Sequence, residues 1–144
     1  MKSLKKTIRN FGVMFFLLIQ FYSPAQTGYK KDLLLATWKL QSMTFSDGKP
    51  YLKTEDLPDE IIMFKTDSVW ERNRGMDKLE GLWYLDGQGI LVIQSLKFNG
   101  VQNDLSGRKS FWKIKELNSD QLVLIYLERE GNNIVYTYNS SFRN

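Results

Sequence analysis

Cysteine and histidine are both absent from this 144-residue chain. Without cysteine, neither a disulfide nor a lipid-modified cysteine can form, so the fold depends on its packed core. Without histidine, the histidine-containing catalytic triads and the zinc sites built from His or Cys are excluded. Carboxylates are therefore the main groups left for acid–base chemistry.

The acidic residues that lie close together in the sequence do not form a convincing catalytic pair. Asp59-Glu60 is adjacent, but neighbouring residues of a strand point to opposite faces. Glu55-Asp56 falls in a predicted loop, and Glu128 and Glu130 end a predicted strand. We interpret all of them as solvated surface groups. The sequence thus predicts no catalytic residue, no metal site and no cofactor, and hence a protein that is not an enzyme.

The first 25 residues have the three-part layout of a secretory signal peptide. Four basic residues precede residue 10, residues 11–22 are almost wholly apolar, and Ser23 and Ala25 are the small residues that a signal peptidase reads. A membrane anchor would need about 20 apolar residues, and this run is shorter. We therefore expect cleavage before Gln26, export to the periplasm or the extracellular space, and no stable membrane anchor afterwards.

Removal of this segment changes the charge of the protein. The full chain carries 20 Lys and Arg against 16 Asp and Glu, a formal net charge of +4. The four basic residues before Gln26 account for the whole excess, so residues 26–144 carry a formal net charge of zero. Nucleic-acid binding uses an excess of positive charge, so we expect no nucleic-acid partner.

The remainder of the chain reads as one all-β domain without a helical period. Short segments of alternating or β-branched character are separated by turn residues such as Asp86-Gly87 and Asn118-Ser119. Leu33-Leu34-Leu35 is predicted to form a helical turn that closes one end of the fold. The expected strands are 38–43, 60–65, 69–73, 79–85, 90–96, 109–116, 121–129 and 134–138. About eight antiparallel strands joined by short turns favour a closed up-and-down barrel.

Three stretches resemble the lipocalin-like proteins, in particular the small exported lipocalin-like domains of bacteria. Ala36-Thr37-Trp38 stands where a lipocalin's first strand has Gly-x-Trp, with alanine in place of the glycine. Residues 81–86 look like the glycine-then-aromatic strand of the bacterial branch, and residues 112–114 with 120–124 resemble its late hairpin. The resemblance implies an eight-stranded lipocalin-like barrel over residues 26–144 that binds a small hydrophobic ligand.

The resemblance also implies a structural role for Trp38. In lipocalins this tryptophan closes one end of the barrel and packs under an arginine from near the last strand. Arg143 is the arginine after the last expected strand, so it is the candidate for a cation–π contact with Trp38.

Alternation along the strands predicts which side chains face the interior. The predicted ligand-binding residues are Trp83, Trp112, Leu124, Tyr136 and Tyr138. The other side chains expected inside are Trp38, Leu40, Met63, Leu91, Ile93, Ile114 and Leu122. An error of one residue in register would exchange the set of any strand.

A second function remains open at this point. The barrel could have a filled core and bind a protein or an envelope glycan through its loops, with segments 45–59 and 98–108 making the contacts. An apolar cavity of about 300–1,000 Å³ would favour the small ligand, whereas a filled interior would favour the interaction module.

Two short patterns resemble modification sites. Asn139-Ser140-Ser141 fits an N-glycosylation acceptor. Asp67-Ser68-Val69 resembles an O-glycosylation pattern of some exported bacterial proteins.

Overall fold

The structure is a computed structural model, and it describes residues 31–102, 104, 106–127 and 133–142. The predicted signal peptide, residues 1–25, and the predicted mature terminus Gln26 lie outside these residues. The elements are α2 (Lys31–Leu34), β1 (Thr37–Phe45), η1 (Thr54–Asp56), β2 (Glu60–Phe64), β3 (Val69–Arg74), β4 (Asp77–Leu85), β5 (Ile90–Phe98), β6 (Lys109–Leu117), β7 (Gln121–Tyr126) and β8 (Ile134–Phe142).

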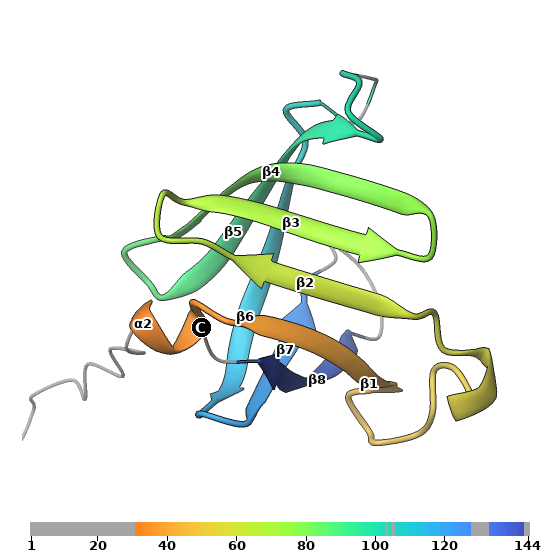
Figure 1. The fold of residues 1–144 in the computed structure, drawn as a ribbon. Coiled ribbons are helices and arrows are strands. Elements are labelled where there is room, and N and C mark those ends of the chain that lie inside the picture. Colours follow the sequence, from red (N-terminus) through yellow and green to blue (C-terminus); the bar gives the residue numbers. More distant parts are fainter. Residues whose placement is uncertain (1–30, 103, 105, 128–132, 143–144) are drawn as a thin grey trace, which may run out of the picture.

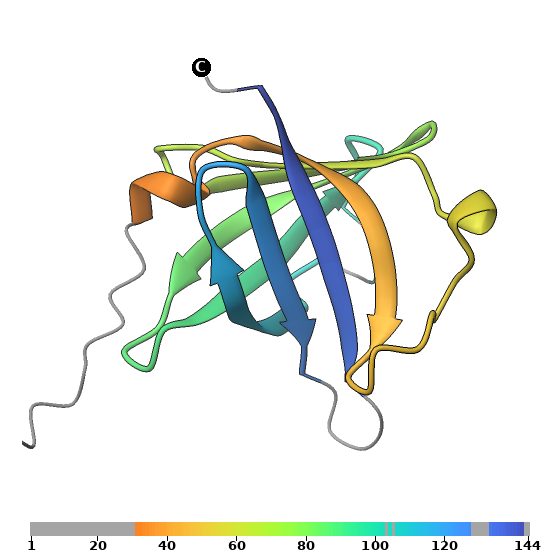
Figure 2. The same cartoon turned by 90° about the horizontal axis from the view of Figure 1, so that it is seen from below.

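The eight strands form a closed antiparallel barrel in which each strand pairs with its neighbours in sequence. Closure comes from β8, which pairs with β1 from Ile134–Phe45 to Phe142–Thr37. Figures 1 and 2 show the strands wrapping around one interior, with α2 at one end. The predicted fold class, an all-β, eight-stranded, up-and-down barrel of lipocalin-like form, is confirmed. Closure gives every strand two neighbours, which removes the free edges of an open sheet except where β1 and β2 separate beyond Lys39.

The two ends of the barrel differ in the segments that lie at them. At the end where β1 and β3 begin and β2 and β4 finish lies α2; we call it the closed end. At the opposite end lie the loop 46–59, the β3–β4 turn and the β5–β6 loop; we call it the open end.

The closed end is filled with large apolar side chains. Trp38 is 0% exposed, and its indole Nε1 donates a 3.0 Å hydrogen bond to the carbonyl oxygen of Leu34 in α2. The helical turn predicted at residues 33–35 is therefore present one to two residues earlier, and Leu34 is itself fully buried. Phe64 packs edge-on against Trp83, with the ring centroids 5.4 Å apart.

The side chains on the inner face form one continuous core. The burial alternates along β1, β2 and β4, as expected when one face of a strand meets the interior. The core comprises Leu34, Trp38, Leu40, Met43, Ile62, Phe64, Trp70, Leu79, Trp83, Leu91, Ile93, Ile114, Leu122, Leu124 and Tyr138.

The prediction for β2 was wrong by one residue. Ile62 and Phe64 are buried, at 3% exposed each, whereas Met63 lies on the outer face. Ile61, Ile62 and Met63 are all apolar, so alternation of polarity could not identify the inner face of this strand. The correct register places Glu60 inside the barrel, with consequences described below.

A glycine on β4 is required by the close approach of β5. The β4–β5 ladder shifts register between Glu80 and Gly81. A Cβ at Gly81 would collide with the carbonyl oxygen of Gln94. Only glycine lets the two backbones meet there, and Gly81 lies directly opposite Trp70 of β3.

The last strand is longer than predicted. It runs to Phe142 rather than ending at Tyr138, and so includes Asn139 of the glycosylation pattern, which is exposed. Ser68, in the other pattern, lies in the β2–β3 turn with φ 64°. Among the described residues, none of the helices has the length and apolarity needed to span a lipid bilayer.

Candidate functional site

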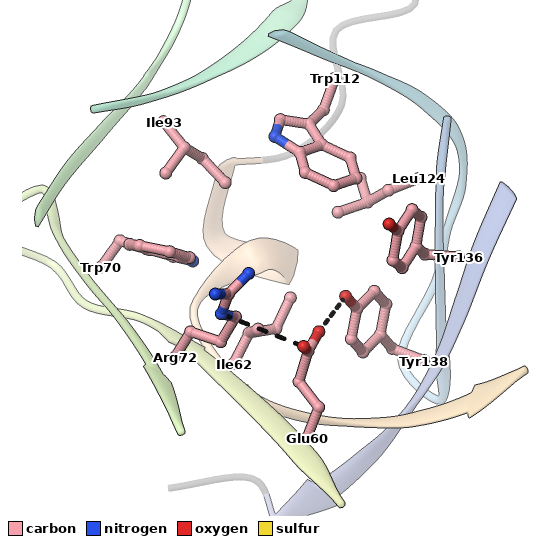
Figure 3. A pocket seen from close by; sticks show the side chains of 9 residues that line it. All are labelled: Glu60, Ile62, Trp70, Arg72, Ile93, Trp112, Leu124, Tyr136 and Tyr138. Carbon is pink, nitrogen blue, oxygen red and sulfur yellow. Dashed lines mark hydrogen bonds and ion pairs between the residues drawn. The ribbon is translucent and has the colours of Figure 1, made fainter. Parts of the chain in front are cut away.

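The interior of the barrel is hollow towards the open end. An inner cavity of about 40 Å³ lies among β2, β3, β5, β6, β7 and β8. A wider cleft of about 250 Å³ extends from it. Trp70, Arg72, Ile93, Trp112 and Tyr136 line both, so the two form one site. The inner part is also lined by Glu60, Ile62, Leu124 and Tyr138, all drawn in Figure 3.

Glu60 is the one buried charged side chain among the described residues, at 2% exposed. Its Oε2 accepts hydrogen bonds from Nε and Nη2 of Arg74, at 2.8 and 2.5 Å. Its Oε1 accepts a 2.8 Å hydrogen bond from the hydroxyl of Tyr138. A buried charge is costly unless it is paired and hydrogen-bonded, and here both carboxylate oxygens have donors.

The expectation that Glu60 is a solvated surface group was therefore wrong. The strand β2 begins at Glu60 and pairs it with Arg74 on β3, which brings the opposite charge to the same face. A signal was present in the sequence. Trp70, Arg72 and Arg74 are every second residue of β3, so they lie on the same face of the strand. If Trp70 faces inward, both arginines do too, and a negative charge is then expected close to them.

Arg72 projects into the centre of the site (Figure 3). Its Nε lies 4.0 Å from Oε2 of Glu60, beyond hydrogen-bond distance. Within the described part of the chain, its guanidinium makes no hydrogen bond. Burial lowers the pKa of Arg72 from its usual value and the charge of Glu60 opposes that change. Because arginine starts from a very high pKa, the group stays charged near neutral pH.

Trp70 also presents an unpaired polar atom. Its side chain is 5% exposed, and its Nε1 is the one buried side-chain nitrogen or oxygen without a hydrogen-bond partner among the described residues. Figure 3 shows this nitrogen directed towards the space between Arg72 and Trp112. An unsatisfied buried donor costs about 1–3 kcal/mol, so an exception of this kind calls for an explanation.

Aromatic rings form the opposite wall. Trp112 packs against Tyr126 and Tyr136, with centroid distances of 4.7 and 5.1 Å. The Nε1 of Trp112, unlike that of Trp70, donates a 2.8 Å hydrogen bond to Oγ of Ser110. Tyr136 stacks on Tyr138 at 6.4 Å.

The two tyrosines stay protonated at neutral pH. Burial, followed by the charge of Glu60, raises the pKa of Tyr136 from its usual value. The same two causes, together with the hydrogen bond to Glu60, raise the pKa of Tyr138 well above it. Both hydroxyls can therefore donate. That of Tyr138 is used by Glu60, whereas that of Tyr136 points into the cavity and has no hydrogen-bond partner among the described residues.

Most of the predicted ligand-binding residues come together at this site. Trp112, Leu124, Tyr136 and Tyr138 line the inner cavity, although contact with a ligand stays a prediction for each. Trp83 does not line it; it is fully buried in the closed half, where it packs edge-on against the ring of Phe64. The sequence missed Glu60, Arg72 and Trp70, which supply the polar atoms of the site.

The predicted structural pair is only partly described. Trp38 lies at the closed end against Leu34, but Arg143 falls outside the described residues. A cation–π contact exists nearby on another ring: Nζ of Lys31 lies 5.1 Å from the ring centroid of Trp83.

The described residues contain no group of three or more Asp, Glu, His or Cys side chains placed to hold a metal ion. Comparison with known proteins gave no matching protein-family model and no matching curated protein. The site must therefore be interpreted from its own geometry.

Proposed function

We propose that this is an exported, lipocalin-like binding protein that holds a small, mainly apolar molecule in the open half of its barrel. The observation that carries the proposal is the cleft of about 250 Å³ that opens into the barrel between Trp70 and Trp112. Its volume lies just below the range of about 300–1,000 Å³ usual for small-molecule sites. The ligand is accordingly small, no larger than a few linked rings or an alkyl chain of moderate length.

The lining supports this assignment. Aromatic and aliphatic side chains make up most of the wall, and a few polar groups converge on one region, as in typical ligand sites. Inside the closed half the core is filled by Trp38, Trp83 and Leu122, each 0% exposed. The filled half provides the rigid frame, and the hollow half provides the site.

The test uses an uncharged fluorescent apolar probe, N-phenyl-1-naphthylamine, titrated into the purified protein. We expect saturable fluorescence enhancement. Ser95→Phe places a bulky ring on the wall of the cleft and should abolish the enhancement. Ser119→Phe, the same change in the β6–β7 turn at the closed end, is the matched control and should bind normally.

An absence of saturable binding, or equal binding by the two variants, would reject the proposal. Fluorescence of the probe at an external surface would be unaffected by Ser95→Phe, so the pair of variants separates the two origins of a signal.

A second candidate is an interaction module that uses the open-end loops. It is favoured by the large apolar side chains that these loops expose: Tyr51 at 43%, Met76 at 97% and Val101 at 65%. Such groups are common on surfaces singly, but contiguous patches mark interaction sites. This function predicts that Ser95→Phe leaves binding of the protein or glycan partner intact, whereas Met76→Ser and Val101→Ser together remove that binding.

A further inference from the structure

Three hydrogen-bond donors point into the same cavity without an acceptor among the described residues. They are the guanidinium of Arg72, the indole Nε1 of Trp70 and the hydroxyl of Tyr136. They come from β3 and β8, on opposite sides of the space that Figure 3 displays. A ligand that satisfies them must bring acceptors.

Glu60 and Ser110 already accept hydrogen bonds from protein donors. Oε2 of Glu60 receives both donors of Arg74, and Oε1 receives the hydroxyl of Tyr138. Oγ of Ser110 accepts from Trp112. A cationic ligand, such as an amine or a guanidine, would therefore have to compete with Arg74 and Tyr138 for the carboxylate that lines the cavity.

The charges lead to the same conclusion. Glu60 carries one negative charge, and Arg72 and Arg74 carry one positive charge each. Arg74 donates two hydrogen bonds to Glu60. Arg72 has only a long ion pair with it, in which Nε lies 4.0 Å from Oε2. The partly buried cluster thus has one positive charge in excess, centred on Arg72.

Building on the proposed function, we propose that the ligand is a small amphipathic monocarboxylic acid whose carboxylate binds Arg72 and Trp70 Nε1. A planar guanidinium binds a carboxylate through two parallel hydrogen bonds, the strongest arrangement available to arginine. The indole N–H then donates to one of the same oxygens, and the hydroxyl of Tyr136 lies across the cavity as a further donor. A monoanion neutralises the single excess charge, which a dianionic phosphate monoester would exceed.

The rest of the ligand follows from the apolar wall. Leu79, Ile93 and Trp112 line the cleft, and Ile93 and Trp112 also line the inner cavity. A short alkyl chain or a single ring directed along them would bury its surface while the carboxylate stays at Arg72. Glu60 acts as a positioning residue, since it fixes Arg74 and Tyr138 and leaves Arg72 for the ligand.

Displacement of N-phenyl-1-naphthylamine tests this head-group assignment. Octanoate and octan-1-ol have the same chain and differ in the charged group. We expect octanoate to bind the wild type about tenfold or more tightly than octan-1-ol, because one charge-assisted bidentate pair supports a difference of that size. Arg72→Gln should remove this preference by weakening octanoate alone.

Two further variants complete the design. Trp70→Phe removes the indole N–H and keeps an aromatic ring, so octanoate should weaken several-fold and octan-1-ol should not. Arg108→Gln, a matched change at an exposed arginine of the β5–β6 loop, should alter neither. If Arg72→Gln does not fold, Trp70→Phe still reports on the carboxylate.

Equal binding of octanoate and octan-1-ol by the wild type would overturn the inference while leaving the proposed function in place. An equal loss of both ligands in Arg72→Gln and in Trp70→Phe would overturn it too. Failure of the neutral probe and of both ligands to bind would reject the proposed function itself.

Discussion

The hydroxyl of Tyr138 on β8 donates a 2.8 Å hydrogen bond to Oε1 of Glu60 on β2, across the strand β1 that lies between them in the barrel. The β1–β2 ladder pairs only Thr37–Lys39 with Ile61–Met63. Glu60 stands directly beyond its last pair. This hydrogen bond therefore joins β8 to β2 at the level of the barrel where the backbone pairing between β1 and β2 has ended.

Loss of this bond should lower stability measurably. Tyr138→Phe removes the hydroxyl and keeps the ring, so Oε1 of buried Glu60 loses its donor. Hydrogen bonds to charged groups contribute about 1.5–3 kcal/mol, and we expect the free energy of unfolding to fall by about that amount in urea melts. Tyr84→Phe, at a residue 41% exposed, is the control and should stay within about 0.5 kcal/mol of the wild type. Equal stability of the two variants would contradict this account.

Tyr138 should also make the fold sensitive to alkali. Burial and the neighbouring Glu60 raise its pKa well above the ordinary 10.0 in the folded state. Below pH 10 the phenol is neutral in both states, so this contribution to stability is fully present. Above pH 10 the unfolded chain loses the proton first, and stability falls as the pH rises further. Urea melts between neutral pH and alkali should show this decline, and a smaller one in Tyr138→Phe; an identical decline in both would rule out Tyr138 as its source.

The barrel itself could be predicted from the sequence, because turn residues and alternation recur along the whole domain. The eight strands, the helical turn before Trp38 and most of the core follow from that pattern. Element ends were less predictable. The strand β8 continues through Asn139, Ser140 and Ser141 because the backbone of β1 pairs with it, and such pairing does not require apolar side chains.

The polar half of the site could not be predicted, for a different reason. In β2, four successive apolar residues, Ile61 to Phe64, do not show which face points inward, and the wrong choice placed Glu60 on the outer face. With Glu60 on the inner face, its negative charge compensates the positive charges of Arg72 and Arg74 on the same face. The aromatic half was predictable since Trp112, Tyr136 and Tyr138 lie on strands with clear alternation.

Export is a prediction that can be tested directly. The basic start, the apolar run and the small residues Ser23 and Ala25 predict cleavage before Gln26. N-terminal sequencing or intact-mass measurement of the protein recovered outside the cytoplasm should find a chain that begins at Gln26. Replacement of Ala25 with a bulky residue should block processing, and recovery of uncut wild-type protein in the membrane fraction would contradict the prediction.

Trp38 and Tyr136 should separate stability from binding. Trp38 is fully buried at the closed end, bonded to Leu34 and away from the residues that line the cavity. Truncation of a buried tryptophan costs about 3–5 kcal/mol, a large share of the 5–15 kcal/mol of a typical domain. Trp38→Ala should therefore melt at much lower urea concentration.

Tyr136→Phe keeps the ring that packs on Trp112 and removes only a hydroxyl that has no hydrogen-bond partner among the described residues. Its urea melt should resemble that of the wild type, because the substitution removes no hydrogen bond between described residues of the folded state. Its affinity for octanoate should fall, since that hydroxyl faces the proposed carboxylate, while octan-1-ol should be less affected. A destabilised Tyr136→Phe, or a Trp38→Ala variant that melts like the wild type, would show that the division into a filled structural end and an open binding end is wrong.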